Sequence, residues 1–199
     1  MTRAGLFGRS PWAAPLWLCV WSTLWTASPA AAVDLVGCLP YYRMNGSYST
    51  NMLPGQLAPL DEIRYFGLTI NSSGAISTLD GASLAAHTNR IATVKQTIDA
   101  LPAADRPRLY ITLGGACEAA AYATVAASST LRATLAQDVL TLMNHTGATS
   151  VDFDWEHPSG ATQRSNYSLM VQRVKQETGS GRRVYATMMP EIFMPASAF

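Results

Sequence analysis

Three carboxylates alternate with three large apolar residues within residues 151–156. The acids are Asp152, Asp154 and Glu156, and the apolar residues are Val151, Phe153 and Trp155. Successive side chains of a β-strand point to opposite faces, so the acids share one face. That face must line a cleft, because three carboxylates cannot be packed into an apolar core without partners. Acids this close raise one another's pKa and titrate together, which suits acid–base catalysis at a glycosidic bond.

Three other interpretations of this segment are weaker. An exposed edge strand would leave the density of large apolar residues unexplained. A calcium or magnesium site would also use oxygen ligands on one face, and a purely structural role is the third. We favour the catalytic interpretation, which requires neither a metal ion nor another cofactor.

Two segments resemble the signatures of glycoside hydrolase family 18, the chitinase family. Residues 149–156 resemble the Asp-Gly-x-Asp-x-Asp-x-Glu that ends the fourth barrel strand, with Thr149 and Ser150 in place of the first Asp and the Gly. Residues 110–115 resemble the Ser-x-Gly-Gly that ends the third strand, with Thr112 in place of Ser. A Gly-Gly pair alone indicates only a turn, but here both motifs follow the family's order and separation.

The resemblance implies a retaining hydrolysis in which the substrate assists. Glu156 would protonate the glycosidic oxygen and later act as the base towards water. Asp154 would hydrogen-bond the acetamido nitrogen while the acetamido oxygen attacks the anomeric carbon. Asp152 would hold the second proton of the set and tune its two neighbours.

The expected partner is an oligo- or polysaccharide that contains N-acetylglucosamine. Aromatic rings suit stacking on sugars, although they suit core packing equally well, and Thr112 could instead fix the acid strand by a hydrogen bond. In the family an aromatic residue commonly follows the first-strand glycine, and Cys38 stands there instead, which weakens the case for chitin itself. The candidate substrate-binding residues are Tyr41, Phe66, Thr112, Gly114, Gly115 and Trp155.

Three functions fit these residues. The first is a chitinase-like hydrolase, the second an endo-β-N-acetylglucosaminidase acting on glycans, and the third a sugar-binding protein without turnover. Trp155 and Pro158 favour the first. Family members that only bind usually lack the acid that is Glu156 here. The histidines are not expected to be catalysts, and His87 and His145 are expected on helix surfaces.

Strand and helix patterns alternate along the chain and predict a parallel sheet covered by helices. An open doubly wound sheet would also fit, but its glycine-rich phosphate loop is absent. The acids and Gly114-Gly115 end their strands, where the reacting groups of a (β/α)8 barrel lie. A complete barrel of this kind has about 250 residues, so residues 33–199 are expected to be its N-terminal part, with about five β/α units. The expected strands are 35–39, 63–70, 108–113, the acidic strand that carries Asp152, Asp154 and Glu156, and 183–189, with helices from Ser83, from about Thr130 and around Tyr167.

Residues 1–32 resemble a secretory signal peptide. Arg3 and Arg9 precede the apolar stretch 13–25, and residues 30–32 are three alanines that suit cleavage. The stretch is shorter than the ~20 residues of a membrane span. We therefore expect a secreted, extracellular or lysosomal protein without a membrane span.

Cysteine content and charge narrow the function further. Cys38 and Cys117 remain after signal removal and could form a disulfide in an oxidising compartment. The net charge is +1 with no basic patch, so no nucleic-acid partner is expected. Glycosylation sequons begin at Asn45, Asn71, Asn144 and Asn166.

Overall fold

One sheet organises the chain in the computed structural model, which describes residues 34–44, 46–48, 53–115 and 119–187. Its order is β1-β2-β4-β5-β6 with every neighbouring pair parallel, and β3 pairs with β2 in an antiparallel hairpin. The strands are β1 Val36–Pro40, β2 Glu62–Ile70, β3 Ile76–Thr78, β4 Arg108–Gly114, β5 Ser150–Asp154 and β6 Arg183–Ala186. The helices are α1 Leu53–Leu57, α2 Leu84–Ala100, α3 Ala119–Ala127, α4 Ser129–Thr146 and α5 Gly160–Thr178.

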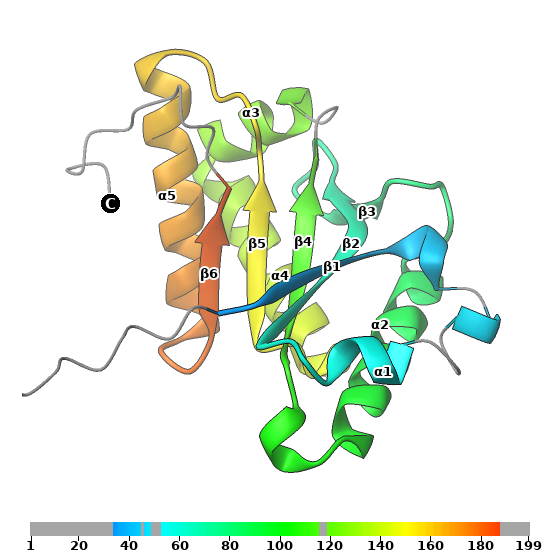
Figure 1. The fold of residues 1–199 in the computed structure, drawn as a ribbon. Helices are drawn as coiled ribbons and strands as arrows, with labels where there is room; N and C mark the ends of the chain where they lie inside the picture. The colour runs from blue at the N-terminus through cyan, green and yellow to red at the C-terminus, as the bar shows by residue number, and fades with distance from the viewer. Residues whose placement is uncertain (1–33, 45, 49–52, 116–118, 188–199) are drawn as a thin grey trace, which may run out of the picture. The chain divides into compact units, whose positions relative to one another are not determined.

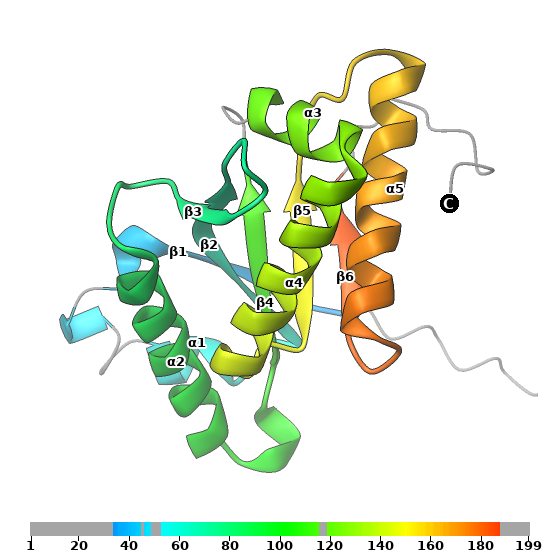
Figure 2. The ribbon, with the colours of Figure 1, turned by 180° about the vertical axis from the view of Figure 1, so that it is seen from behind.

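The four longer helices lie together on one face of the sheet. Figure 2 looks onto α2, α3, α4 and α5, and Figure 1 looks onto the opposite face. A curved parallel sheet with its helices on the outer face is the wall of a (β/α)8 barrel. The partial barrel predicted from the sequence is therefore confirmed, with five parallel strands in the described part of the chain.

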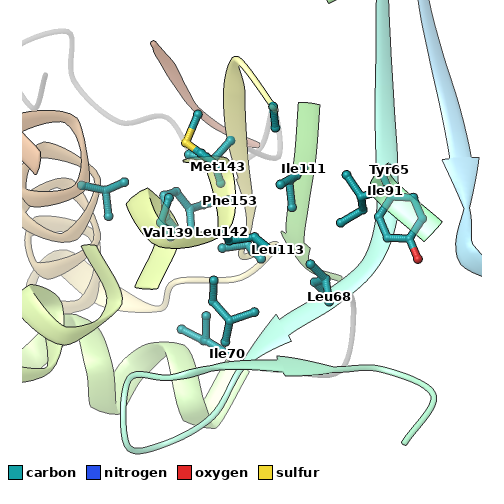
Figure 3. Close-up of a cluster of buried hydrophobic side chains, with 14 of the residues drawn as sticks. Tyr65, Leu68, Ile70, Ile91, Ile111, Leu113, Val139, Leu142, Met143 and Phe153 are labelled. Atoms are coloured by element: carbon teal, nitrogen blue, oxygen red, sulfur yellow. The ribbon is translucent and has the colours of Figure 1, made fainter. Parts of the chain in front are cut away.

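The hydrophobic core lies between the sheet and these helices (Figure 3). Strand residues at alternate positions point into it, because the pleat sends every second side chain to the helix face. They pack against one stripe of each helix. The fully buried examples include Tyr65, Ile111, Leu113 and Phe153 from the strands and Ile91, Val139 and Met143 from the helices.

Helix boundaries follow the capping residues that the sequence offers. Ser83 caps α2 by accepting a hydrogen bond from the Ala86 amide at 3.2 Å. Gly147 ends α4 with φ of 71°, a left-handed conformation that glycine adopts without strain. The sequence patterns did not predict β3 or α3, which are short. Cys117, Asn45 and residues 1–32 lie outside the described residues, and Cys38 is exposed.

The expectation that His87 lies on a helix surface is wrong. Its side chain is fully buried, with Nδ1 2.8 Å from the Tyr65 hydroxyl and Nε2 2.8 Å from Asp80 Oδ1. His87 stands four residues before Ile91 and so belongs to the core-facing stripe of α2. Burial raises the pKa of Tyr65 to about 12, which keeps its hydroxyl protonated as a partner for the ring. His145 is exposed, as expected.

A buried carboxylate joins the amino-terminal ends of three strands on the inner face. Glu62 is 3% exposed, and its Oε1 accepts hydrogen bonds from Tyr110 at 2.6 Å and from Arg108. Arg183 adds a longer contact at 3.5 Å. Burial alone would raise the pKa of Glu62, but the hydrogen bonds from Tyr110 and Arg108 and the two arginine charges lower it below the ordinary value.

We expect Glu62→Gln to lower the free energy of unfolding by about 1–3 kcal/mol near neutral pH, because it removes the charge that these donors share. A lowered folded-state pKa gives stability that is present above the ordinary carboxyl range and is lost as the pH falls through the folded-state pKa. The difference between the variant and the wild type should therefore shrink in acid. Urea denaturation at several pH values measures it. Glu177→Gln, which removes only an i,i+4 helix pair with Arg173, should cost far less, and equal losses would contradict the role of Glu62.

Candidate active site

The three acids lie at the carboxyl end of β5 and just beyond it. Asp152 is 3% exposed, Asp154 is half-buried, and the Glu156 side chain is 29% exposed. Val151, Phe153 and Trp155 are buried in the hydrophobic core. The alternation read from the sequence is thus confirmed, and Asp152 is the most deeply buried of the three acids.

Asp152 is held by residues of β2 and β4 and by one residue just after β6. Arg64 Nη1 of β2 is 3.4 Å from Asp152 Oδ2. The Thr112 hydroxyl of β4 lies 3.5 Å from the same oxygen. The Thr187 hydroxyl, which follows β6, lies 3.3 Å from each of the two carboxylate oxygens of Asp152. Thr112 therefore contacts the acid strand, in line with the interpretation that it fixes this strand by a hydrogen bond rather than binding substrate. Neither Arg64 nor Thr187 was singled out by the sequence motifs.

The environment raises the pKa of two acids. Burial raises the pKa of Asp152, although the charge of Arg64 and the hydrogen bonds from Thr187 and Thr112 oppose it. Burial, followed by the charges of Glu156 and Asp152, raises the pKa of Asp154. Carboxyls that interact in this way share their protons. The site can therefore retain a proton in a pH range in which an isolated aspartate has lost it.

The glycine pair after β4 fixes the end of the acid strand. The Gly115 amide donates to the Asp154 carbonyl oxygen at 2.9 Å. Gly114 has φ of 113°, and a Cβ there would stand 2.6 Å from that carbonyl oxygen. The two strand ends approach so closely that only glycine fits. Gly114 and Gly115 thus act through the backbone of Asp154.

Three aromatic residues lie on the helix side of the strand ends. Tyr122 of α3 donates to the Leu113 carbonyl at 2.6 Å, and Tyr167 of α5 donates to the Phe153 carbonyl at 2.8 Å. Trp155 lies between their rings, at centroid distances of 5.6 Å and 5.2 Å. These contacts tie the ends of β4 and β5 to two helices and so position the acids.

The prediction that Trp155 binds substrate needs correction, because its ring belongs to this cluster. The residue is 2% exposed and its indole packs in the core. The strand alternation itself places position 155 opposite the acids. Trp155 therefore supports the site from behind.

Tyr41 is half-buried, and its role in sugar binding stays a prediction. Its ring packs 5.6 Å from the buried His87 and 5.9 Å from the Arg90 guanidinium, so it contacts α2. Gly67 allows this approach, because a Cβ at Gly67 would stand 2.8 Å from Tyr41 Cβ. The chain turns into a short 3-10 helix at Tyr41, so the strand alternation no longer sets its direction.

Phe66 stays with the site. It is half-buried and stands beside Thr112 in the register of β2 and β4. A Cβ at Gly115 would lie 3.1 Å from its ring, so the ring covers the glycine pair. Phe66 therefore lies on β2 against the glycine pair that ends β4, next to the strand that bears the acids.

The described residues offer neither a metal cluster nor a membrane-spanning helix. Residues 34–44, 46–48, 53–115 and 119–187 hold no cluster of three or more histidine, cysteine, aspartate or glutamate side chains arranged for a metal ion. None of the helices formed by these residues has the length and apolar character to cross a membrane.

A barrel wall that carries alternating carboxylates at the carboxyl end of one strand defines an α/β-barrel protein with the acid set of a glycoside hydrolase. Comparison with known proteins identifies the family. The model of Glycosyl hydrolases family 18 matches residues 38–196, and the chain belongs to this family.

Curated relatives and solved structures agree with that assignment. The chain is 27% identical over 159 residues to Chitinase 1 of Aphanocladium album, covering 73% of this chain and 38% of the relative. It is 25% identical over 177 residues to Endochitinase 1 of Metarhizium anisopliae, covering 78% and 42%. The chain therefore spans less than half the length of these relatives.

Two solved structures show the same fold. The Group IV chitinase of Ostrinia furnacalis superposes with a TM-score of 0.64 at 18% identity, covering 78% of this chain and 43% of that one. The chitinase-like agglutinin RobpsCRA of Robinia pseudoacacia gives 0.65 at 14% identity, covering 78% and 46%.

Proposed function

We propose that this chain is the amino-terminal part of a secreted glycoside hydrolase that cleaves β-1,4-linked N-acetylglucosamine polymers by substrate-assisted, retaining hydrolysis. The acid face at the end of β5 carries the proposal. Asp152 is buried and ion-paired, Asp154 is half-buried and electrostatically coupled to both other acids, and the Glu156 side chain is 29% exposed. A glycosidic oxygen can therefore reach Glu156, while Asp152 lies deeper in the site.

In this mechanism Glu156 gives its proton to the leaving glycosidic oxygen. The acetamido oxygen of the substrate attacks the anomeric carbon, so the nucleophile comes from the sugar itself. Glu156, now ionised, then takes a proton from water, and the water opens the cyclic intermediate with retention of configuration. One carboxyl thus serves as acid and as base.

Asp154 stabilises the positive charge that develops on the acetamido group. A carboxyl at this position can hold the acetamido nitrogen by a hydrogen bond and orient its oxygen toward the anomeric carbon. Its raised pKa matters because the group must share a proton with its neighbours before the substrate arrives. The backbone contact with Gly115 fixes its place at the end of β5.

A binding protein without turnover is the alternative that the comparisons keep open. One solved structure of the same fold is described as a chitinase-like agglutinin. The presence of Glu156 at the solvent end of the acid face favours turnover over binding alone. An endo-acting enzyme on N-linked glycans would use the same acids and differs only in its substrate.

The proposal is tested on the complete protein that contains this chain. We expect release of fluorophore from a chitobioside, cleavage of N-acetylglucosamine oligomers, and a β-anomer as the first product by proton NMR. Cleavage of a glycoprotein glycan with no action on the oligomers would select the endoglycosidase. Binding of the oligomers without cleavage would select the agglutinin-like role.

The proposed secretion has a separate test. Expression in a eukaryotic host with residues 1–32 in place should release a product whose amino terminus lies near Val33. Retention of the intact amino terminus inside the cell would contradict a cleaved signal peptide.

A further inference from the structure

The guanidinium of Arg64 is the counter-charge inside the acid face. Its Nη1 lies 3.4 Å from Asp152 Oδ2, and its side chain is 29% exposed while that of Asp152 is 4% exposed. In the strand register Arg64 stands beside Tyr110, two residues before the row of Thr112 and Asp152. The long side chain therefore reaches diagonally across β4 to the acid strand.

Two tyrosines hold the guanidinium in this place. Its carbon atom lies 5.7 Å from the ring centroid of Tyr110 and 5.9 Å from that of Tyr185, within the range of cation–π attraction. The two hydroxyls hydrogen-bond to each other at 2.7 Å, and Tyr110 also donates to Glu62 at 2.6 Å. The arginine is thus fixed between rings that are themselves anchored.

We propose that Arg64 is a positioning residue of the acid strand. Its guanidinium holds the Asp152 carboxylate ionised and oriented, so that the proton retained by the strand resides on Asp154. The inference rests on the proposed function for its chemical meaning, because it locates the proton of the catalytic set. It differs from the expectation drawn from the family resemblance, in which Asp152 holds the second proton.

The other charges around the acid face do not compensate for Arg64. Arg108 and Arg183 are bound to Glu62 at the opposite ends of the strands, and Arg108 also contacts Asp34. His157 is 63% exposed and 3.9 Å from Glu156. The charge of Arg64 lowers the pKa of both Asp152 and Asp154 against the effect of burial. The titratable or charged groups that interact with Arg64, Asp152 or Asp154 are Tyr110, Tyr185, Glu156 and Tyr167.

An ionised Asp152 has a direct consequence for its neighbour. Its negative charge raises the pKa of Asp154, so Asp154 becomes the better proton carrier of the two. The proton then lies on the carboxyl next to Glu156 along the face. Without Arg64 the buried Asp152 would be the group that burial protonates first.

The test is a direct titration of the full chain, labelled with carbon-13 at the aspartate and glutamate carboxyls and followed by NMR. In the wild type we expect Asp152 to ionise at a lower pH than Asp154. The measurement requires no substrate and no turnover, so it tests the role of Arg64 even in a chain without activity. A failure of the proposed hydrolysis is therefore distinguishable from a failure of this inference.

Three variants complete the experiment. Arg64→Gln should raise the midpoint of Asp152 by about 1 pH unit or more, since an opposite charge near a carboxyl generally lowers its pKa by about 1–3 units. Arg64→Lys keeps the charge and should restore most of the wild-type midpoint. Arg43→Gln removes an equal charge from an exposed position and should leave Asp152 unchanged.

Two results would overturn the proposal. One is a higher titration midpoint for Asp152 than for Asp154 in the wild type. This comparison needs no variant, so it decides the question even if Arg64→Gln fails to fold. The other is a shift of Asp152 in Arg64→Gln no larger than in Arg43→Gln. A purely structural role for Arg64 would change the melting temperature but would not separate the Lys and Gln variants by their Asp152 midpoints.

Discussion

Replacing Glu156 by Gln should abolish measurable hydrolysis of N-acetylglucosamine oligomers in the complete protein while leaving their binding within a few-fold. The amide has nearly the same shape and can still accept a hydrogen bond, but it cannot give a proton to the glycosidic oxygen. Positioned proton transfer typically contributes about 10²–10⁴ in rate. Glu156 serves both half-reactions, so the loss should be at the upper end. Turnover of a fluorogenic chitobioside and calorimetric binding of an oligomer measure the two quantities separately.

Glu177→Gln provides the matched control, because it makes the same chemical change on the surface of α5. Its rate should equal that of the wild type. A Glu156→Gln protein that turns over at near-normal rate would show that another group is the acid. Loss of rate together with loss of binding would instead indicate a collapsed site.

The acid strand could be predicted from the sequence because its information is local. A period of two fixes which side chains share a face, and the large apolar residues between the acids fix which face is buried. The structure agrees, with Phe153 fully buried and Asp152 turned toward Thr112 and Thr187. The same rule places Trp155 on the face opposite the acids, although its aromatic ring suggested stacking on a sugar.

Arg64 could not be predicted from the sequence, because its contact depends on the register of strands that are far apart in the chain. Asp152 lies 88 residues later, and β4 stands between the two strands. His87 shows a related limit. The spacing of His87 from Ile91 could be read from the sequence. Its burial could not, because it depends on the partners Tyr65 and Asp80, which lie outside α2. Polar residues in a core are decided by tertiary partners rather than by local pattern.

The second large effect is expected at Asp154. Changing Asp154 to Ala should lower turnover by about 10²–10³, since one preorganised group that stabilises developing charge is usually worth that much. The side chain is half-buried and contacts no other described residue by a hydrogen bond of its own, so truncation should disturb the fold little. Asp105→Ala, at an exposed position, is the matched control and should leave the rate unchanged.

The role of Asp154 also decides between two mechanisms. If it stabilises an intermediate formed by the acetamido group, a thiazoline that mimics this intermediate should inhibit the wild type and bind the Asp154→Ala protein much more weakly. If Asp154 were instead a nucleophile, a sugar would become covalently bound to it, as in an ordinary retaining glycosidase. Mass spectrometry of protein trapped with a slow substrate distinguishes the two. An adduct on the peptide that contains Asp154 would contradict substrate assistance, because the acetamido oxygen and the carboxylate cannot both form the first bond to the anomeric carbon.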